Sequence, residues 1–164
     1  MELRKENFEC IKEDNSEEEN EKQWEVSKNI FESFKEYLIN KGCKENIVER
    51  QIGCITYFVM DYFFVYADEI SVLETNEATI RKFLGNWYIR KNWSPNFKEI
   101  KEILSALFDF FDFLKSIQLI SIEQYESLIH TCKDKVWFEN RLKTYKTAEG
   151  DNFKEWIQEY NYDW

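Results

Sequence analysis

Residues 94–119, with the sequence SPNFKEIKEILSALFDFFDFLKSIQL, constrain the fold of this chain more than any other stretch. Their apolar side chains recur every three or four positions, the spacing that aligns one face of an α-helix. These side chains are Ile100, Ile103, Leu104, Leu107, Phe108, Phe111 and Leu114. Phe110 and Phe113 lie off this stripe and widen the apolar surface to well over half of the helix. We therefore predict a central helix that other helices cover on several sides.

The composition favours helices in the rest of the chain as well. The 164 residues include only 4 Gly and 1 Pro, so the turn residues that a sheet requires are scarce. Aromatic residues make up 18% of the chain and can fill a dense core. We predict an all-α domain in which Ser94 caps the central helix and Pro95 occupies its first turn.

Three further amphipathic helices are predicted before the central one. They cover about residues 23–40, 44–66 and 76–91. With the central helix they make a four-helix bundle over about residues 23–118, within a domain of residues 23–120. Gly53 lies inside the second helix, where glycine costs ~1 kcal/mol relative to alanine, and so predicts close contact with a neighbouring helix.

The two ends of the chain differ from this bundle. Residues 1–22 contain 4 basic and 9 acidic side chains and lack a sustained apolar period, which predicts a disordered acidic tail. A short turn at Phe8 and Ile11 is the alternative. Residues 121–164 are predicted to form two or three short helices that pack on the domain. Ser121 and Asp134 mark two helix starts.

The C-terminal aromatic side chains allow two interpretations. They are Trp156, Tyr160, Tyr162 and Trp164. The segment could dock on a partner, or the last helix could pack back on the domain and shield Phe110 and Phe113. We favour packing on the domain.

Residues from about 30 to 120 carry the resemblance to a known family. The matching features are Phe34, Tyr37 and Leu38 in the first helix, Gly42 in the turn, residues 47–58, residues 73–75, residues 80–84, Ser94, and LSALFDFFDFL at residues 104–114. Together they resemble the N-terminal core-binding (SAM-like) domain of tyrosine recombinases and phage integrases. The resemblance implies a four-helix domain that clamps double-stranded DNA against a separate catalytic domain.

The chain departs from this family in its catalytic half. Only 46 residues, 119–164, follow the fourth helix, and they contain one His and one Arg. The family's chemistry needs a nucleophilic Tyr with Arg and His partners on a domain of its own. We therefore expect no recombinase activity, and no other catalytic motif is recognisable, so the chain is predicted not to be an enzyme.

Five basic side chains are the candidates for DNA-backbone contact. They are Lys44 and Arg50 on the second helix, and Lys98, Lys101 and Lys115 on the central helix. The central helix is also predicted to expose four carboxylates, those of Glu99, Glu102, Asp109 and Asp112. Because these carboxylates and a net charge of −10 repel phosphate, the alternative is that the five side chains belong to an ordinary solvated face.

Other chemistry receives weaker support. His130 and Cys132 could ligate a metal, but no second pair has ligand spacing, so no metal or other cofactor is predicted. Acidic side chains on the central helix could hold Mg²⁺ for hydrolysis, yet no glycine-rich loop or histidine accompanies them. The longest apolar run is too short to span a bilayer, and a reducing cytoplasm is the expected setting.

Two functions remain as the main hypotheses, with a divergent hydrolase as a third. The first is a non-catalytic DNA-binding or recombination-accessory module. The second is an acidic protein-interaction module of the same fold, which engages a recombinase or another basic protein or mimics DNA. The oligomeric state is left open.

Overall fold

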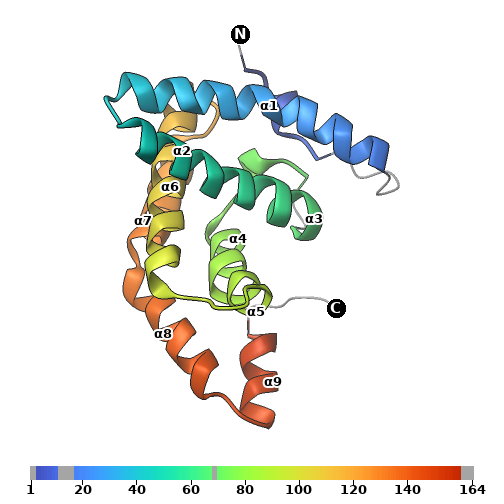
Figure 1. Cartoon of the computed structure of the whole chain (residues 1–164), viewed down its shortest axis with the longest axis vertical. Helices are drawn as coiled ribbons and strands as arrows, with labels where there is room; N and C mark the ends of the chain where they lie inside the picture. The colour runs from blue at the N-terminus through green and yellow to red at the C-terminus, as the bar shows by residue number, and fades with distance from the viewer. Residues whose placement is uncertain (1–2, 11–16, 68–69, 160–164) are drawn as a thin grey trace.

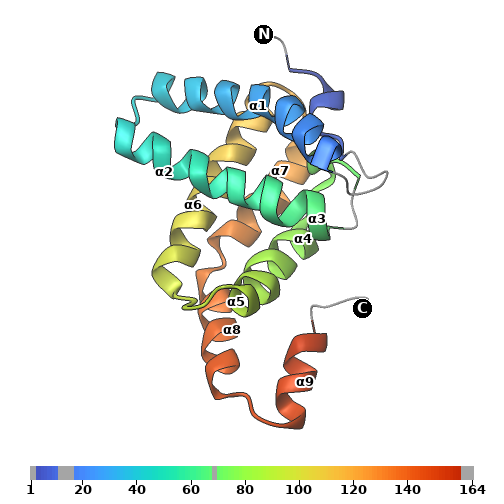
Figure 2. The same ribbon diagram turned by 45° about the vertical axis from the view of Figure 1, so that its right-hand side comes forward.

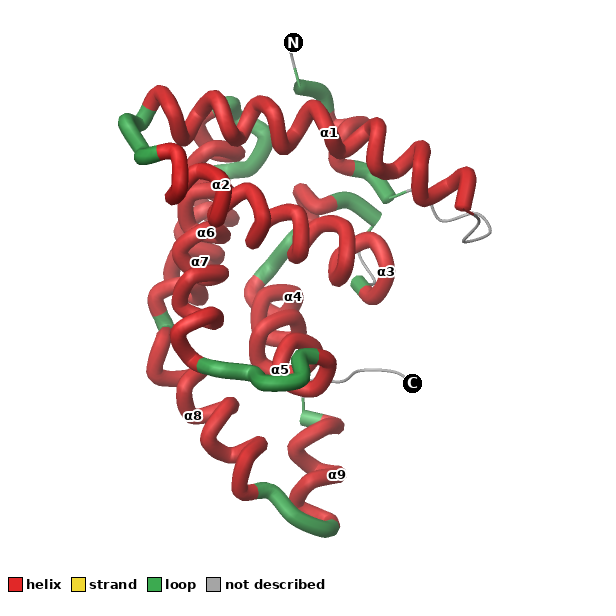
Figure 3. The backbone as a smooth tube through the Cα atoms, in the orientation of Figure 1, coloured by secondary structure: helices red, strands yellow, loops and turns green. Residues whose placement is uncertain are grey.

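The computed structural model describes residues 3–10, 17–67 and 70–159. Within these ranges the chain is an all-α helical bundle without a β-strand, which confirms the predicted fold class (Figure 3). The α-helices are α1 (Glu17–Asn40), α2 (Glu45–Thr56), α3 (Phe64–Tyr66), α4 (Glu77–Lys82), α5 (Tyr88–Lys91), α6 (Phe97–Ser116), α7 (Ile122–Lys133), α8 (Lys135–Thr147) and α9 (Asp151–Gln158). Two 3₁₀ helices, η1 (Lys5–Phe8) and η3 (Val72–Glu74), and two π-helices, η2 (Tyr57–Phe63) and η4 (Phe83–Trp87), complete the secondary structure.

The helices cross one another around α6. In Figure 1, α1 lies across one end of the upright pair α6 and α7, and α2 runs beneath α1. The α4–α5 segment packs beside them, and α8 and α9 form a hook at the opposite end, which Figure 2 shows from a second side. None of the helices that the structure describes combines the length and hydropathy needed to cross a membrane.

The second and third predicted helices are each continuous rods with a π-helical segment inside. One rod runs through α2, η2 and α3, and the other runs through α4, η4 and α5. The two π segments meet through aromatic rings: the ring centroid of Tyr62 lies 4.8 Å from that of Phe83 and 5.4 Å from that of Trp87. This ring cluster joins the two rods.

Helix α6 is the central helix, as predicted, but it begins later. Its N-cap is Asn96, whose side chain accepts a hydrogen bond from the backbone N–H of Glu99 at 2.9 Å. The prediction that Ser94 caps this helix was therefore wrong. Asn96 accepts the hydrogen bond from the first turn, and Ser94 lies in the preceding bend. Phe110 and Phe113 are buried, as expected of a helix covered on several sides.

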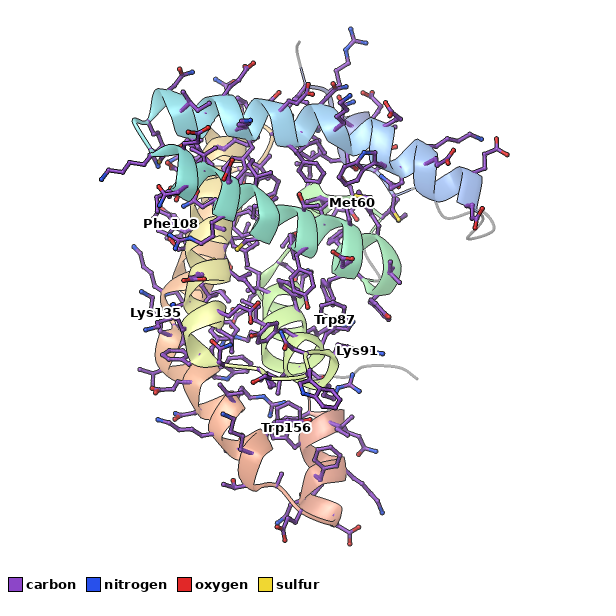
Figure 4. The ribbon with its side chains drawn as sticks, in the orientation of Figure 1. Met60, Trp87, Lys91, Phe108, Lys135 and Trp156 are labelled. Atoms are coloured by element: carbon purple, nitrogen blue, oxygen red, sulfur yellow. The ribbon has the colours of Figure 1, made fainter. Side chains whose placement is uncertain are left out.

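Helix α1, not the last helix, covers these two rings. The Phe34 ring lies 5.3 Å from Phe110, and the Tyr37 ring lies 5.4 Å from Phe113. Helix α9 instead packs on α8, with Trp156 between them (Figure 4). The prediction that the last helix shields Phe110 and Phe113 was wrong, because α8 and α9 form a hook away from this part of α6. Tyr160, Tyr162 and Trp164 lie outside the described residues.

The starts of the C-terminal helices agree with the sequence. The hydroxyl of Ser121 accepts a hydrogen bond from the backbone N–H of Gln124 at 3.1 Å and caps α7. The carboxylate of Asp134 accepts one from the backbone N–H of Trp137 at 3.3 Å and caps α8. Within the described residues, three helices, α7 to α9, follow the central helix.

The N-terminal segment is folded against the bundle in the parts that the structure describes. Phe8 is fully buried in the core, and the backbone N–H of Cys10 donates to the carbonyl of Ile70 at 2.7 Å. Helix α1 begins at Glu17, before the predicted start at residue 23. The prediction of a disordered tail was therefore wrong for residues 3–10 and 17–22, because one buried ring anchors a segment whose composition is otherwise polar. Ile11 lies outside the described residues.

Gly53 does not mark a close helix contact. It is exposed on α2, and a Cβ there would meet no atom within 4 Å. The close approach is at Gly85, where a Cβ would lie 2.5 Å from Cη2 of Trp137 on α8. The expectation for Gly53 was wrong because a helical glycine can also face solvent.

Replacing Gly53 with alanine is therefore expected to stabilise the protein by about 0.5–1 kcal/mol, because alanine loses less backbone entropy on folding. Gly85→Ala is the matched contrast and should destabilise it by about 1–3 kcal/mol, because the added methyl group displaces the Trp137 ring. Urea denaturation of both variants measures whether the free energy of unfolding rises in Gly53→Ala and falls in Gly85→Ala. A destabilised Gly53→Ala variant would contradict the exposed position of this residue.

Candidate nucleic-acid interface

A polar groove of about 310 Å³ lies between α2 and α6. Its lining residues are Arg50 and Gln51 from α2, and Lys98, Lys101, Glu102 and Ser105 from α6. The α6 residues are three or four positions apart and therefore share one face of that helix. This face is directed outward because the apolar stripe of α6 occupies the core.

The groove brings together three of the five predicted DNA contacts: Arg50, Lys98 and Lys101. One carboxylate accompanies them, with Glu102 Oε1 at 3.6 Å from a guanidinium nitrogen of Arg50. Three cations and one carboxylate line the groove, which gives its lining a formal charge of +2. Lys98 and Lys101 form no salt bridge with the described residues. The groove is therefore locally positive on a molecule of net charge −10.

The other two candidates do not line this groove. Lys115 lies 3.4 Å from a carboxylate oxygen of Asp112, and its ammonium group is 3.9 Å from the centroid of the Tyr125 ring. Lys44 is exposed at the N-cap of α2, ahead of Arg50 along that helix. We therefore restrict the candidate interface to Arg50, Lys98 and Lys101.

The four acidic residues of α6 are not a free row of carboxylates. Glu99 accepts a hydrogen bond from the Tyr88 hydroxyl at 2.6 Å, and Glu102 pairs with Arg50. Asp109 accepts one from Nζ of Lys41 at 2.9 Å and one from Nε2 of Gln51 at 2.7 Å. The expectation that they simply face solvent was wrong, because polar side chains of the neighbouring helices reach them.

Asp112 joins α6 to two other helices. Its carboxylate accepts hydrogen bonds from the hydroxyl of Tyr37 on α1 at 2.6 Å and from that of Tyr125 on α7 at 3.2 Å. The Tyr37 hydrogen bond holds the pKa of Asp112 below its usual value, whereas burial, with the Asp112 hydrogen bond second, raises the pKa of Tyr37 to about 12. Because the folded pKa of Asp112 is lowered, its contribution to stability is present at neutral pH and is lost in acid.

The other candidate residues are separately buried or exposed, or are engaged by neighbouring side chains. Cys132 is buried, and burial raises the pKa of its thiol to about 12, while His130 on the same helix is exposed. Within the described ranges, no group of three or more His, Cys, Asp or Glu side chains could hold a metal ion. The carboxylates of α6 are engaged by tyrosine, lysine, arginine and amide donors.

Sequence reasoning did not identify Gln51 as part of this site. Its side chain is 7% exposed, Nε2 donates to Asp109, and Oε1 has no hydrogen-bond partner among the described atoms. A signal was present in the sequence, because Gln51 falls at helical spacing between the buried residues Val48 and Ile55. A polar residue on an apolar stripe indicates a specific role in packing or binding.

Comparison of the chain with protein-family models, with curated proteins and with solved structures found no match. The fold and the groove define an all-α helical bundle with a local basic site. The resemblance of residues 30–120 to integrase core-binding domains remains a prediction from the sequence.

Proposed function

We propose that this chain is a non-catalytic module that binds the backbone of double-stranded DNA through the groove between α2 and α6. It would act as an accessory to a recombination system, as the resemblance to integrase core-binding domains implies. The observation that carries the proposal is the convergence of Arg50, Lys98 and Lys101 on one groove.

The predicted binding is weak and depends strongly on salt. Three phosphate contacts give a slope of about −2.7 in a plot of log affinity against log salt concentration. Between 50 and 200 mM salt, this slope corresponds to a loss of about 40-fold in affinity. The net charge of −10 further reduces long-range attraction, so the contacts must be local.

Fluorescence anisotropy with a labelled 20-base-pair duplex at 50 mM salt tests this proposal. The double variant Lys98→Gln/Lys101→Gln should weaken binding and reduce the salt slope by about two. The matched control Lys28→Gln/Lys35→Gln makes the same charge change at two exposed positions of α1 and should have a much smaller effect. Absence of binding at micromolar protein, or equal losses in the two variants, would refute the proposal.

A second candidate function rests on the exposed side of α1. Its exposed acidic residues include Glu17, Glu18, Glu21, Glu25, Glu32 and Glu36. This helix lies at one end of the molecule, so a basic protein could approach these side chains (Figure 1). The alternative is therefore an interaction module that engages a recombinase or another basic protein, or that mimics DNA.

Nuclease treatment separates the two functions. Binding of a basic protein to immobilised chain should survive nuclease and should be lost when Glu17, Glu18, Glu21 and Glu25 are changed to Gln. DNA-mediated retention should disappear with nuclease and should depend on Lys98 and Lys101 instead.

A further inference from the structure

Trp93 is fully exposed, at 101% of its reference area, in the segment between α5 and α6. Tryptophan is rarely displayed in this way, because its large apolar ring is normally at least partly covered. The five other tryptophans include buried or partly buried rings such as Trp87, Trp137 and Trp156. Trp93 is the most exposed of the large hydrophobic side chains that the structure describes.

The segment that carries Trp93 is held in place on both sides. Before it, the side chain of Asn92 accepts a hydrogen bond from the backbone N–H of Ser94 at 3.0 Å. After it, the backbone N–H of Asn96 donates to the hydroxyl of Tyr88 at 3.3 Å, and that hydroxyl donates to Glu99 at 2.6 Å. The backbone around Trp93 is thus preorganised, which reduces the entropy lost when the ring meets a ligand.

Trp93 is close in sequence to a residue that lines the basic groove. Trp93 precedes Lys98 by five residues, and five residues span at most about 18 Å. Lys98 is in the first turn of α6 and lines the groove with Lys101 and Arg50. One continuous ligand with an aromatic part and negative charges can therefore reach both the ring and the cations.

We infer that Trp93 stacks on an unpaired base of a nucleic-acid strand whose phosphates lie in the groove between α2 and α6. The inference rests on the groove of the proposed function and extends its ligands beyond fully paired DNA to strands with an unpaired base: single-stranded nucleic acid, or a duplex with a base out of the stack. Base stacking on an exposed aromatic ring combined with a cationic groove is the usual physical basis of single-strand binding.

The charge pattern favours a nucleic-acid strand over an anionic membrane surface. The cations line a hollow of about 310 Å³ rather than a flat face. Trp93 is also the only large hydrophobic side chain exposed between α5 and α6 in the described structure, and one ring contributes little membrane insertion.

The test compares fluorescence anisotropy of labelled (dT)20 and of a labelled 20-base-pair duplex at 50 mM salt. Trp93→Ala and Trp93→Leu should each weaken (dT)20 binding by about tenfold, because the stacking surface is lost, and Trp93→Phe should retain most of the affinity. Duplex affinity should change less than twofold in all three variants. The salt slope for (dT)20 should stay the same in Trp93→Ala, because no phosphate contact is removed.

The control is Trp24→Ala, which removes a partly exposed ring on α1 and should change neither affinity. If Trp93→Ala leaves (dT)20 affinity within twofold while Lys98→Gln/Lys101→Gln still weakens duplex binding, the inference fails and the proposed function stands. If neither nucleic acid binds, both fail. Binding to phosphatidylcholine vesicles with one quarter phosphatidylserine that depends on Trp93, without (dT)20 binding, would assign the ring to a membrane surface and overturn the inference.

Discussion

Replacing Phe110 with alanine is expected to lower the free energy of unfolding by about 3–5 kcal/mol. The ring is fully buried on α6 and packs edge-on against Phe34, with ring centroids 5.3 Å apart. It also lies within 6.2 Å of the rings of Phe111 and Phe113 on its own helix. Removing it leaves a cavity that three aromatic neighbours cannot fill. Urea denaturation followed by circular dichroism measures the loss.

Phe108→Ala is the matched control for this experiment, because it makes the same change on the same helix. Phe108 is only partly buried on the outer side of α6 (Figure 4), and the ammonium group of Lys133 lies 5.7 Å from its ring centroid. Replacing Phe108 should lower the free energy of unfolding by less than half as much as replacing Phe110. Equal losses in the two variants would contradict the assignment of Phe110 to the core.

The replacement Arg141→Leu is expected to destabilise the protein by about 3–5 kcal/mol and to release α9. Arg141 is 6% exposed, and its guanidinium group lies 3.8 Å from the centroid of the Trp156 ring. It donates hydrogen bonds to the carbonyl oxygens of Gly85 and Trp156, each at 3.1 Å. Leucine would keep some packing but would leave both carbonyls without this donor. The ion pair with Glu159 contributes little, since that carboxylate is 61% exposed.

Two measurements check this prediction: the urea midpoint and the hydrogen exchange of the amides in α9. Lys143→Leu on the same helix is the control, because Lys143 is 65% exposed and its ion pair among the described residues is with the partly exposed Glu139. The control replacement should change the free energy of unfolding by no more than about 0.5 kcal/mol. A fast-exchanging α9 in Arg141→Leu, with slow exchange in the control, is the expected result. Unchanged protection of α9 in Arg141→Leu would show that other contacts hold this helix.

Periodicity predicted the helices well because burial of one face determines where apolar residues occur. It predicted the central role of α6 and, with the capping residues Ser121 and Asp134, the starts of α7 and α8. Periodicity placed Phe108 on the apolar stripe and Phe110 beside it. In the structure Phe110 is more deeply buried than Phe108. A helix covered on several sides has no single apolar stripe. A pattern based on one face therefore misjudges how deeply each of its side chains is buried.

The candidate site was predictable only in part. Lys98, Lys101 and Arg50 came from the expected exposed faces of two helices, and these faces do meet at one groove. The pairing of Asp112 with Tyr37 and Tyr125 was not predictable, because it depends on how α1 and α7 cross α6. Trp93 lies between two predicted helices, where no periodic pattern reports the exposure of a single loop residue.

The burial of Phe8 means that the core of the protein extends beyond the region of helical periodicity. A truncated version beginning at residue 23 would lack the ring that Phe8 places in the core and the first turns of α1. Biochemical work on an isolated domain should therefore retain the N-terminal segment.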